Sequence, residues 1–278
     1  MAQTAPTPKN ENKGAMSSSF ASLVIPLSVV VGILIYYFVM GNSSNFEGGD
    51  TKNHPVAEGA GHVLGLIYKG GFIVPILLSL VIMLITFSIE RFLTISKATG
   101  TGSVQVFVSK VRNHLNAGNV EAALAECDKQ KGSVANVVKS TLKRYKEVEN
   151  DPTLNKEQKL LAIQKEVEES TTLELPMLEQ NLVVIATMAS VSTLIALLGT
   201  VLGMIKAFSA LASAGSSDSV GLANGISEAL INTALGIGNS AVAIIMYNVF
   251  TSKIDKITYA IDEAGYSIIQ TFAARHKD

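Results

Sequence analysis

The stretch GISEALINTALGIGNSAVAI (225–244) is almost wholly apolar, yet it carries a carboxylate, an amide and a hydroxyl at Glu228, Asn232 and Thr233. At a rise of about 1.5 Å per residue, a helix of about 20 residues crosses the hydrocarbon core of a bilayer. An ionised carboxylate at the centre of such a helix costs roughly 2.5–3.5 kcal/mol, so it normally faces a cavity or a partner. The stretch therefore predicts a transmembrane helix with a polar face, unless Glu228, close after Gly225, lies among the lipid headgroups.

The composition of the whole chain also indicates a membrane protein. Hydrophobic residues make up 48% of the 278 residues and charged residues only 16%, which is more apolar than an ordinary soluble domain requires. The net charge of −1 predicts no nucleic-acid partner. The single cysteine, Cys127, excludes an internal disulfide and a multi-cysteine metal site, and we expect it to pack as a small residue within a helix.

Long apolar runs predict an all-α fold, a polytopic helical membrane protein with four transmembrane helices. We expect these spans over residues 20–40, 72–95, 182–213 and 226–250. The last two runs exceed the hydrocarbon core, so their helices should project into water. The first run could instead belong to a signal peptide, but it exceeds the roughly 7–15 residues of a signal core and lacks a small-x-small cleavage site, so we favour an anchor.

The lysine and arginine residues predict the orientation. About a dozen of them lie in 96–181, which the positive-inside rule places in the cytoplasm as a helical domain. Crossing parity then places the segment 41–71 and the turn 214–225 outside. The N-terminal tail 1–19 and the C-terminal helix 251–278 are expected inside.

Stop and cap residues divide the segment 96–181 into short antiparallel helices. In NHLNAGNVEAALAECDKQKG (113–132), Gly118 and Gly132 are stop signals and Asn119 is an N-cap.

A longer helix should follow this small bundle. Asp151 and Pro152 in NDPTLNKEQ (150–158) predict its cap and first residue. We expect it to continue through a kink at Pro176 into the third span.

The sequence contains no signature of a soluble enzyme. GLANGISEAL (221–230) lacks the lysine and the preceding strand of a phosphate-binding loop. The histidines are scattered and fit no zinc motif, at His54, His62, His114 and His276. We therefore predict no enzymatic activity, no metal and no cofactor.

Small residues in the last two spans predict close helix packing. Gly199 and Gly203 form a GxxxG step, and Gly236 with Ser240 has the same spacing. The hydroxyl of Thr200 has two interpretations, because a membrane hydroxyl either bonds its own backbone carbonyl or faces a polar space.

A polar stripe runs along the last span. Glu228 and Asn232 are four residues apart and share one helix face, which Asn239 continues. This pattern predicts a wet or polar-packed face.

Two segments, LLGTVLGMIKAF (197–208) and GISEALINTALGI through YNVF (225–250), resemble the two signature segments of ExbB and TolQ, in order and without gaps. These proteins are subunits of the MotA/TolQ/ExbB proton-channel family. The resemblance covers the last two spans closely, and the second span and the loop only in layout. The first span and the segment 41–71 are additions to the usual three-span plan of the family.

The resemblance implies a homo-oligomer, a pentamer in the family, which surrounds an ExbD-like single-span protein dimer in a central pore. It implies that Glu228, Thr200 and Thr233 line a proton pore in the bacterial inner membrane, with the segment 41–71 in the periplasm. Proton flow would drive a TonB-like protein that energises outer-membrane transport. In that scheme an aspartate of the partner takes the proton and Glu228 shapes the pore.

The chain also departs from the family pattern. Thr193 and Val242 stand where the family often has proline, and Asn232 and Asn239 replace small apolar residues. Lys206 adds a positive charge near the outer end of its span. Asn232, Lys206 and Asn239 are therefore candidate pore or pore-flanking residues that bear on ion choice, H⁺ or Na⁺, and on partner fit.

Three other functions stay open at this point. A TolQ-like subunit in envelope constriction would use the same pore chemistry. A flagellar or gliding stator would need to engage a rotor through the segment 96–181, which shows no distinctive charged stripe. A non-conducting membrane scaffold would use the polar residues only to hold helices together.

An ion pair between Lys206 and Glu228 follows if Thr200 and Thr233 share a level in the pore, as the resemblance implies. The two helices run in opposite directions, so Lys206 lies about 9 Å outward of Thr200 and Glu228 about 7.5 Å outward of Thr233. These depths are nearly equal, which permits a pair within or between subunits. The alternative is that Lys206 extends independently to the outer headgroups.

Overall fold

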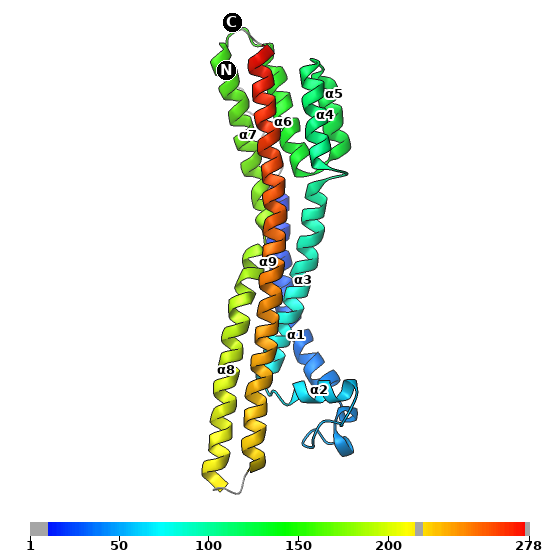
Figure 1. The fold of residues 1–278 in the computed structure, drawn as a ribbon, viewed down its shortest axis with the longest axis vertical. Coiled ribbons are helices and arrows are strands. Elements are labelled where there is room, and N and C mark those ends of the chain that lie inside the picture. The colour runs from blue at the N-terminus through cyan, green and yellow to red at the C-terminus, as the bar shows by residue number, and fades with distance from the viewer. Residues whose placement is uncertain (1–10, 215–218, 276–278) are drawn as a thin grey trace. The chain divides into compact units, whose positions relative to one another are not determined.

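The computed structural model describes residues 11–214 and 219–275, and these residues are predominantly helical (Figure 1). Within this part of the chain, the only strand-like pairing is one isolated bridge between Phe46 and Pro55. Among the described residues, four helices are long and apolar enough to cross a membrane. The predicted fold class, an all-α polytopic membrane protein, is confirmed.

The chain divides into two compact units. Among the described residues, the first comprises 11–88, 183–214 and 219–247, and the second 89–182 and 248–275. The first unit contains α1 (Glu11–Leu34), the π-helical turn η1 (Ile35–Met40), α2 (Ala60–Tyr68) and parts of α3 (Ile73–Thr99), α8 (Leu182–Ala214) and α9 (Ser219–Arg275).

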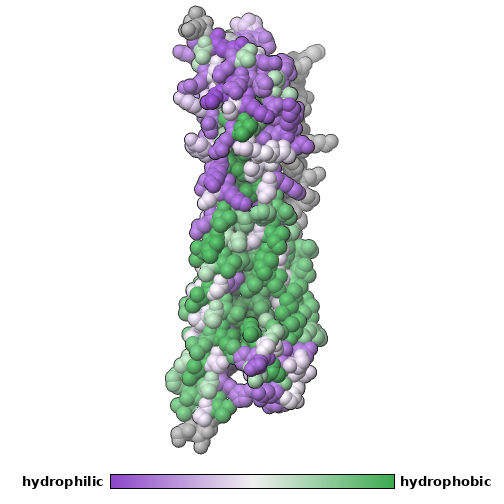
Figure 2. Space-filling view, turned by 45° about the vertical axis from the view of Figure 1, so that its right-hand side comes forward, coloured by the Kyte–Doolittle hydropathy of each residue, from purple (hydrophilic) through white to green (hydrophobic). Residues whose placement is uncertain are grey.

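The helices of the first unit carry an apolar outer surface (Figure 2). Large aliphatic and aromatic side chains are exposed on each of its long helices, including Leu23, Phe38, Ile85, Leu194 and Leu230. A soluble monomer rarely exposes so much contiguous apolar surface, whereas lipid or a neighbouring helix would cover it.

The segment 41–71 is folded and compact. It contains two short 3₁₀ turns, η2 (Ser43–Asn45) and η3 (Glu47–Gly49), followed by α2. The Asn45 amide is buried and donates to the carbonyl oxygens of Val39 and Met40, at 2.7 and 3.0 Å. These bonds satisfy carbonyls at the end of η1 that have no partner within the turn.

The second unit is a bundle of α4, α5, α6, α7 (Lys156–Glu179) and the end of α9. The bounds of its first helices are Val104–Asn116 (α4), Val120–Gln130 (α5) and Gly132–Glu149 (α6). Asn119 accepts a hydrogen bond from the Ala122 N–H at 2.9 Å, which confirms the predicted cap. Gly118 and Gly132 have φ values of 79° and 81° at the two junctions, where a glycine is least strained.

The predicted start of the next helix, at Asp151 and Pro152, is wrong. Helix α7 (Lys156–Glu179) begins after Asn155, which forms a reciprocal capping box with Gln158. This box satisfies two backbone N–H groups at once. Asp151 instead closes a turn by accepting hydrogen bonds from the N–H and hydroxyl of Thr153.

The prediction of one continuous helix kinked at Pro176 is also wrong. Pro176 lies inside α7, which ends at Glu179, and Asn181 has a φ of 63° before α8 begins at Leu182. A proline removes a hydrogen bond from the helix and weakens the turn around it. Here the chain breaks shortly after the proline.

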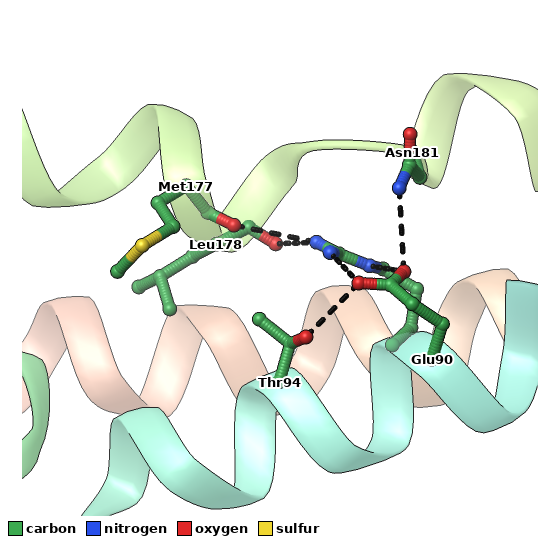
Figure 3. A network of polar contacts seen from close by, with 6 residues as sticks. Glu90, Thr94, Met177, Leu178 and Asn181 are labelled. Atoms are coloured by element: carbon green, nitrogen blue, oxygen red, sulfur yellow. Dashed lines mark hydrogen bonds and ion pairs between the residues drawn. The ribbon is translucent and has the colours of Figure 1, made fainter. Parts of the chain in front are cut away.

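A buried arginine satisfies the carbonyls at this break (Figure 3). Arg91 is 2% exposed and donates to the carbonyl oxygens of Met177 and Leu178, at 3.3 and 3.2 Å. Glu90 pairs with Arg91 and accepts a hydrogen bond from the Asn181 amide at 3.3 Å. The ionic network compensates for the hydrogen bonds that the broken helix lacks.

The predicted turn 214–225 is shorter than expected. Residues 215–218 lie outside the described residues, and α9 begins at Ser219. Gly225 lies inside α9, and its missing side chain allows the backbone of Ala207 to approach closely; a Cβ there would lie 2.6 Å from Ala207 N. Of the predicted tails, residues 1–10 and 276–278 also lie outside the described part, while α1 begins at Glu11.

Cys127 should be chemically inert in the folded protein. It is 2% exposed, and burial raises the pKa of its thiol to about 12. The thiolate is the reactive form, so maleimide near neutral pH should leave native Cys127 unmodified and label it only after denaturation. Because the thiol ionises at lower pH in the unfolded chain, its contribution to stability is present at neutral pH and falls as the pH rises toward about 12.

A cysteine introduced at the exposed Glu147 of the same unit is the control and should react at once. Equal labelling rates at the two positions in native protein would contradict the buried assignment.

Candidate functional site

The candidate site is the hairpin of α8 and α9 in the first unit, where polar side chains from both helices meet. At one level, Lys206 Nζ lies 2.6 Å from Glu228 Oε1. The Glu228 side chain is 12% exposed and that of Lys206 is 52% exposed. The structure thus contains, within one chain, the ion pair that the helix register predicts.

Thr200 and Thr233 form the next level of the hairpin. Their hydroxyls contact each other, and each also contacts a carbonyl of its own helix at 3.0 Å, that of Ala196 and that of Ala229. Two hydroxyls have two protons, so at most two of these three contacts are hydrogen bonds at any moment. The pair can therefore exchange between bonding each other and bonding the backbone.

The two asparagines of α9 have partners inside the chain. Asn232 is fully buried and donates to the carbonyl oxygen of Gly70 at 2.9 Å. Asn239 is nearly buried and donates to the Ser192 hydroxyl at 2.7 Å. Ser240 donates to the carbonyl of Ala189. Asn239 and Ser240 thus join α9 to α8, and Asn232 joins α9 to the backbone that follows α2. Of the three, only Asn232 lies near Glu228.

Glycines allow α8 and α9 to approach closely enough for these contacts. A Cβ at Gly203 would lie 2.8 Å from Ala229 N, and one at Gly199 would lie 2.8 Å from the Asn232 Cβ. A Cβ at Gly236 would overlap Ala196 and lie 2.7 Å from the Ser192 carbonyl. Separations this short are not found between real side-chain carbons, so the helix contact requires glycine.

The outer face of α8 carries a shallow, open hollow beside Thr200. The hollow has a volume of about 560 Å³ and is lined mainly by apolar side chains, among them Val201, Met204, Ile205 and Phe208. The hairpin therefore carries a polar interior, with Thr200 at the boundary between that interior and an apolar outer face.

The site has no arrangement suited to a metal. Within residues 11–214 and 219–275, no group of three or more His, Cys, Asp or Glu side chains could hold an ion. His62 contacts the Val56 carbonyl oxygen at 2.7 Å and lies in the segment 41–71. His276 lies outside the described residues.

Sequence reasoning missed the residues that approach Glu228 from outside the hairpin. Gly70 and Gly71 follow α2, and a Cβ at Gly71 would lie 2.9 Å from the Glu228 carboxyl carbon. The adjacent glycines, directly before an apolar run, were the only available signal. They indicate a turn but do not identify what packs against it.

The geometry defines a multi-pass helical membrane protein with an ion-paired carboxylate inside a transmembrane hairpin. Residues 129–263, which include every residue of this hairpin site, match the MotA/TolQ/ExbB proton channel family. This match, over just under half of the chain, confirms the resemblance of its last two spans to that family.

Individual relatives share this region at modest identity. The chain is 38% identical to the ExbB-like 3 protein of Synechocystis over 31% of its own length and 42% of that protein's. It is 40% identical to the Tol-Pal system protein TolQ of Haemophilus influenzae, over 30% of its own length and 37% of that protein's. It is 33% identical to the biopolymer transport protein ExbB of Pseudomonas putida, over 31% of its own length and 26% of that protein's. In each case the chain spans less than half the length of the relative.

The close approach at Gly236 should be essential to the hairpin. Gly236→Ala places a methyl group against Ala196, and overpacking of this kind lowers the free energy of unfolding by roughly 1–3 kcal/mol. Gly238→Ala on the same helix is the matched control, because a Cβ there meets no atom within 4 Å. That change should be neutral or stabilising by up to about 1 kcal/mol. Reversible unfolding in mixed micelles measures both, and equal effects would refute the packing argument.

The Lys206–Glu228 pair should show coupling in a double-mutant cycle. Lys206→Met and Glu228→Gln each strand the other charge, whereas the double variant removes both. We expect an interaction free energy of roughly 0.5–3 kcal/mol. The value should fall in the lower part of this range, because Lys206 is half exposed and water screens it. If the two single changes in the free energy of unfolding sum to that of the double variant, the pair contributes nothing to stability.

Proposed function

We propose that this chain is the proton-channel subunit of an ExbB-like inner-membrane motor that couples the proton motive force to energised outer-membrane transport. The observation that carries the proposal is the Lys206–Glu228 pair within an apolar hairpin, inside the region that matches a proton channel family. Intramembrane ionisable side chains are expensive and typically mark ion pathways.

The proposed pore forms between copies of the chain. In this arrangement Glu228, Thr200 and Thr233 line the path, and Lys206, Asn232 and Asn239 flank it. The homo-oligomer would be a pentamer around an ExbD-like single-span dimer, which passes work to a TonB-like protein. The hollow beside Thr200 supports this assembly, because a neighbouring helix would fill it.

The proposed orientation places the segment 96–181 and the C-terminal helix in the cytoplasm. The concentration of lysine and arginine in 96–181 supports it, since basic loops remain on the cytoplasmic side. The segment 41–71 and the α8–α9 turn are then periplasmic. Each proton that crosses inward releases about 2.3 kcal/mol per 100 mV of membrane potential, enough for a few protons to drive a conformational cycle.

A TolQ-like role is the second candidate, because the chain is as similar to a TolQ protein as to ExbB-like relatives. The 40% identity to the Haemophilus influenzae TolQ protein lies close to the identity to ExbB-like relatives. Purification of the tagged chain under mild conditions, followed by identification of the bound single-span protein, separates the two roles. An ExbD-like partner favours the first and a Tol-system partner the second.

Removal of the Glu228 charge should impair conduction. The complex purified with its partner is placed in proteoliposomes, and acidification is followed with a trapped dye under an imposed potential. Glu228→Gln should lower proton flux by ~10-fold or more, equivalent to about 1.4 kcal/mol. Glu58→Gln, an exposed carboxylate in the segment 41–71, is the control and should leave the flux unchanged.

Assembly of the Glu228→Gln complex is checked by its mass. Normal flux from a correctly assembled complex would contradict the assignment of Glu228 to the pore. Imposing a Na⁺ gradient instead of an H⁺ gradient across the same vesicles shows which of the two ions the complex conducts.

A further inference from the structure

The backbone that joins α2 to α3 lies directly against Glu228. Gly71 has a φ of 78°, and any Cβ at this position would overlap the Glu228 carboxylate. The chain can approach the carboxylate this closely only because residue 71 is glycine. The Glu228 oxygen that pairs with Lys206 is the same oxygen that a Cβ at residue 71 would meet.

A hydrogen bond holds the same backbone to α9 one turn further on. The Asn232 amide donates to the Gly70 carbonyl at 2.9 Å, and Asn232 is completely buried. Gly70 also packs closely on α9, because a Cβ there would lie 2.9 Å from the Ile231 Cγ2. Residues 70 and 71 thus cover the face of α9 that carries Glu228 and Asn232.

The end of the first span holds this backbone in place. The rings of Tyr36 and Tyr68 are stacked with centroids 4.6 Å apart, and the Tyr36 hydroxyl donates to the Tyr68 carbonyl at 3.1 Å. Tyr36, Met40 and Val74 form a buried cluster, against which Leu235 of α9 packs. A continuous set of contacts therefore runs from the first span through Tyr68 to Gly71 and α9.

We propose that the first span and the backbone of residues 68–71 form a positioning element that holds the Glu228 carboxylate beside Lys206. Without this element, the Glu228 side chain would be free to adopt other rotamers, since residues 70 and 71 occupy the space against the face of α9 that carries it. Tyr36 and Asn232 act through the backbone of Tyr68 and Gly70 and are positioning residues. Only the consequence for proton flux depends on the proposed function.

The test measures how readily Glu228 is modified in the full chain in lipid nanodiscs. Dicyclohexylcarbodiimide adds to membrane-embedded carboxyl groups as a stable N-acylurea, which peptide mass spectrometry locates. Tyr36→Ala and Asn232→Leu should each raise the modification rate at Glu228 by roughly 5- to 30-fold, the population change that one or two kcal/mol produces. Tyr36→Phe keeps the ring stack and should have a smaller effect.

Two controls separate positioning from unfolding. Phe38→Ala removes a 73% exposed ring from η1, outside the Tyr36 cluster, and should leave the Glu228 rate unchanged. Circular dichroism of each variant in the same nanodiscs reports on its helices, because Cys127 lies in the second unit and reports on that unit alone. If Tyr36→Ala loses helical signal, the milder Tyr36→Phe and Asn232→Leu variants decide the matter.

The outcomes distinguish this inference from the proposed function. Unchanged modification in folded Tyr36→Ala and Asn232→Leu overturns the positioning element, as does an equal rise in Phe38→Ala. A selective rise supports the element. If the wild-type complex conducts no protons in proteoliposomes, the proposed function fails while the labelling result stands.

Discussion

The ion pair between Lys206 and Glu228 constrains how α8 and α9 pack in the first unit. A carboxylate in a low-dielectric surrounding needs a partner of opposite charge, and removing one member of such a pair strands the other. The half-exposed Lys206 can keep contact with water while its aliphatic stem packs along the helix. The pair also fixes the register of α8 against α9, because a shift of one residue would rotate Glu228 by roughly 100° away from Lys206.

The close spacing of α8 and α9 is needed for the ion pair and for the other polar contacts between these two helices. The Thr200–Thr233 and Ser192–Asn239 contacts are short, and they form only where two backbones approach closely. Glycine at 199, 203 and 236 permits that approach within a single chain. The GxxxG step is thus occupied by the chain's own hairpin, while the large aliphatic side chains of α8 and α9 remain on the outside, where lipid or further helices would contact them.

The sequence predicted what depends on local pattern and on helix geometry. The four spans were predicted from hydropathy. The similar depth of Lys206 and Glu228, which allows their ion pair, was predicted from the rise per residue of a helix. The start of α7 was misplaced because Asp151 and Asn155 are both acceptable caps, and only Asn155 is followed at the right spacing by Gln158. The contact of Gly70 with Asn232 joins residues 162 positions apart, and no periodicity in the sequence encodes it.

Three side-chain donors, one local and two from distant parts of the sequence, bond carbonyl groups at or just beyond the end of a helix. Asn45 bonds carbonyls at the end of η1, Arg91 bonds those at the end of α7, and Asn232 bonds Gly70 just after α2. Water would serve these carbonyls in a soluble protein, but a dry interior requires a donor from the chain itself. Asn232 therefore has a reason to be polar that is independent of any pore. Because it also lies one turn from Glu228, the same amide links the end of α2 to the carboxylate.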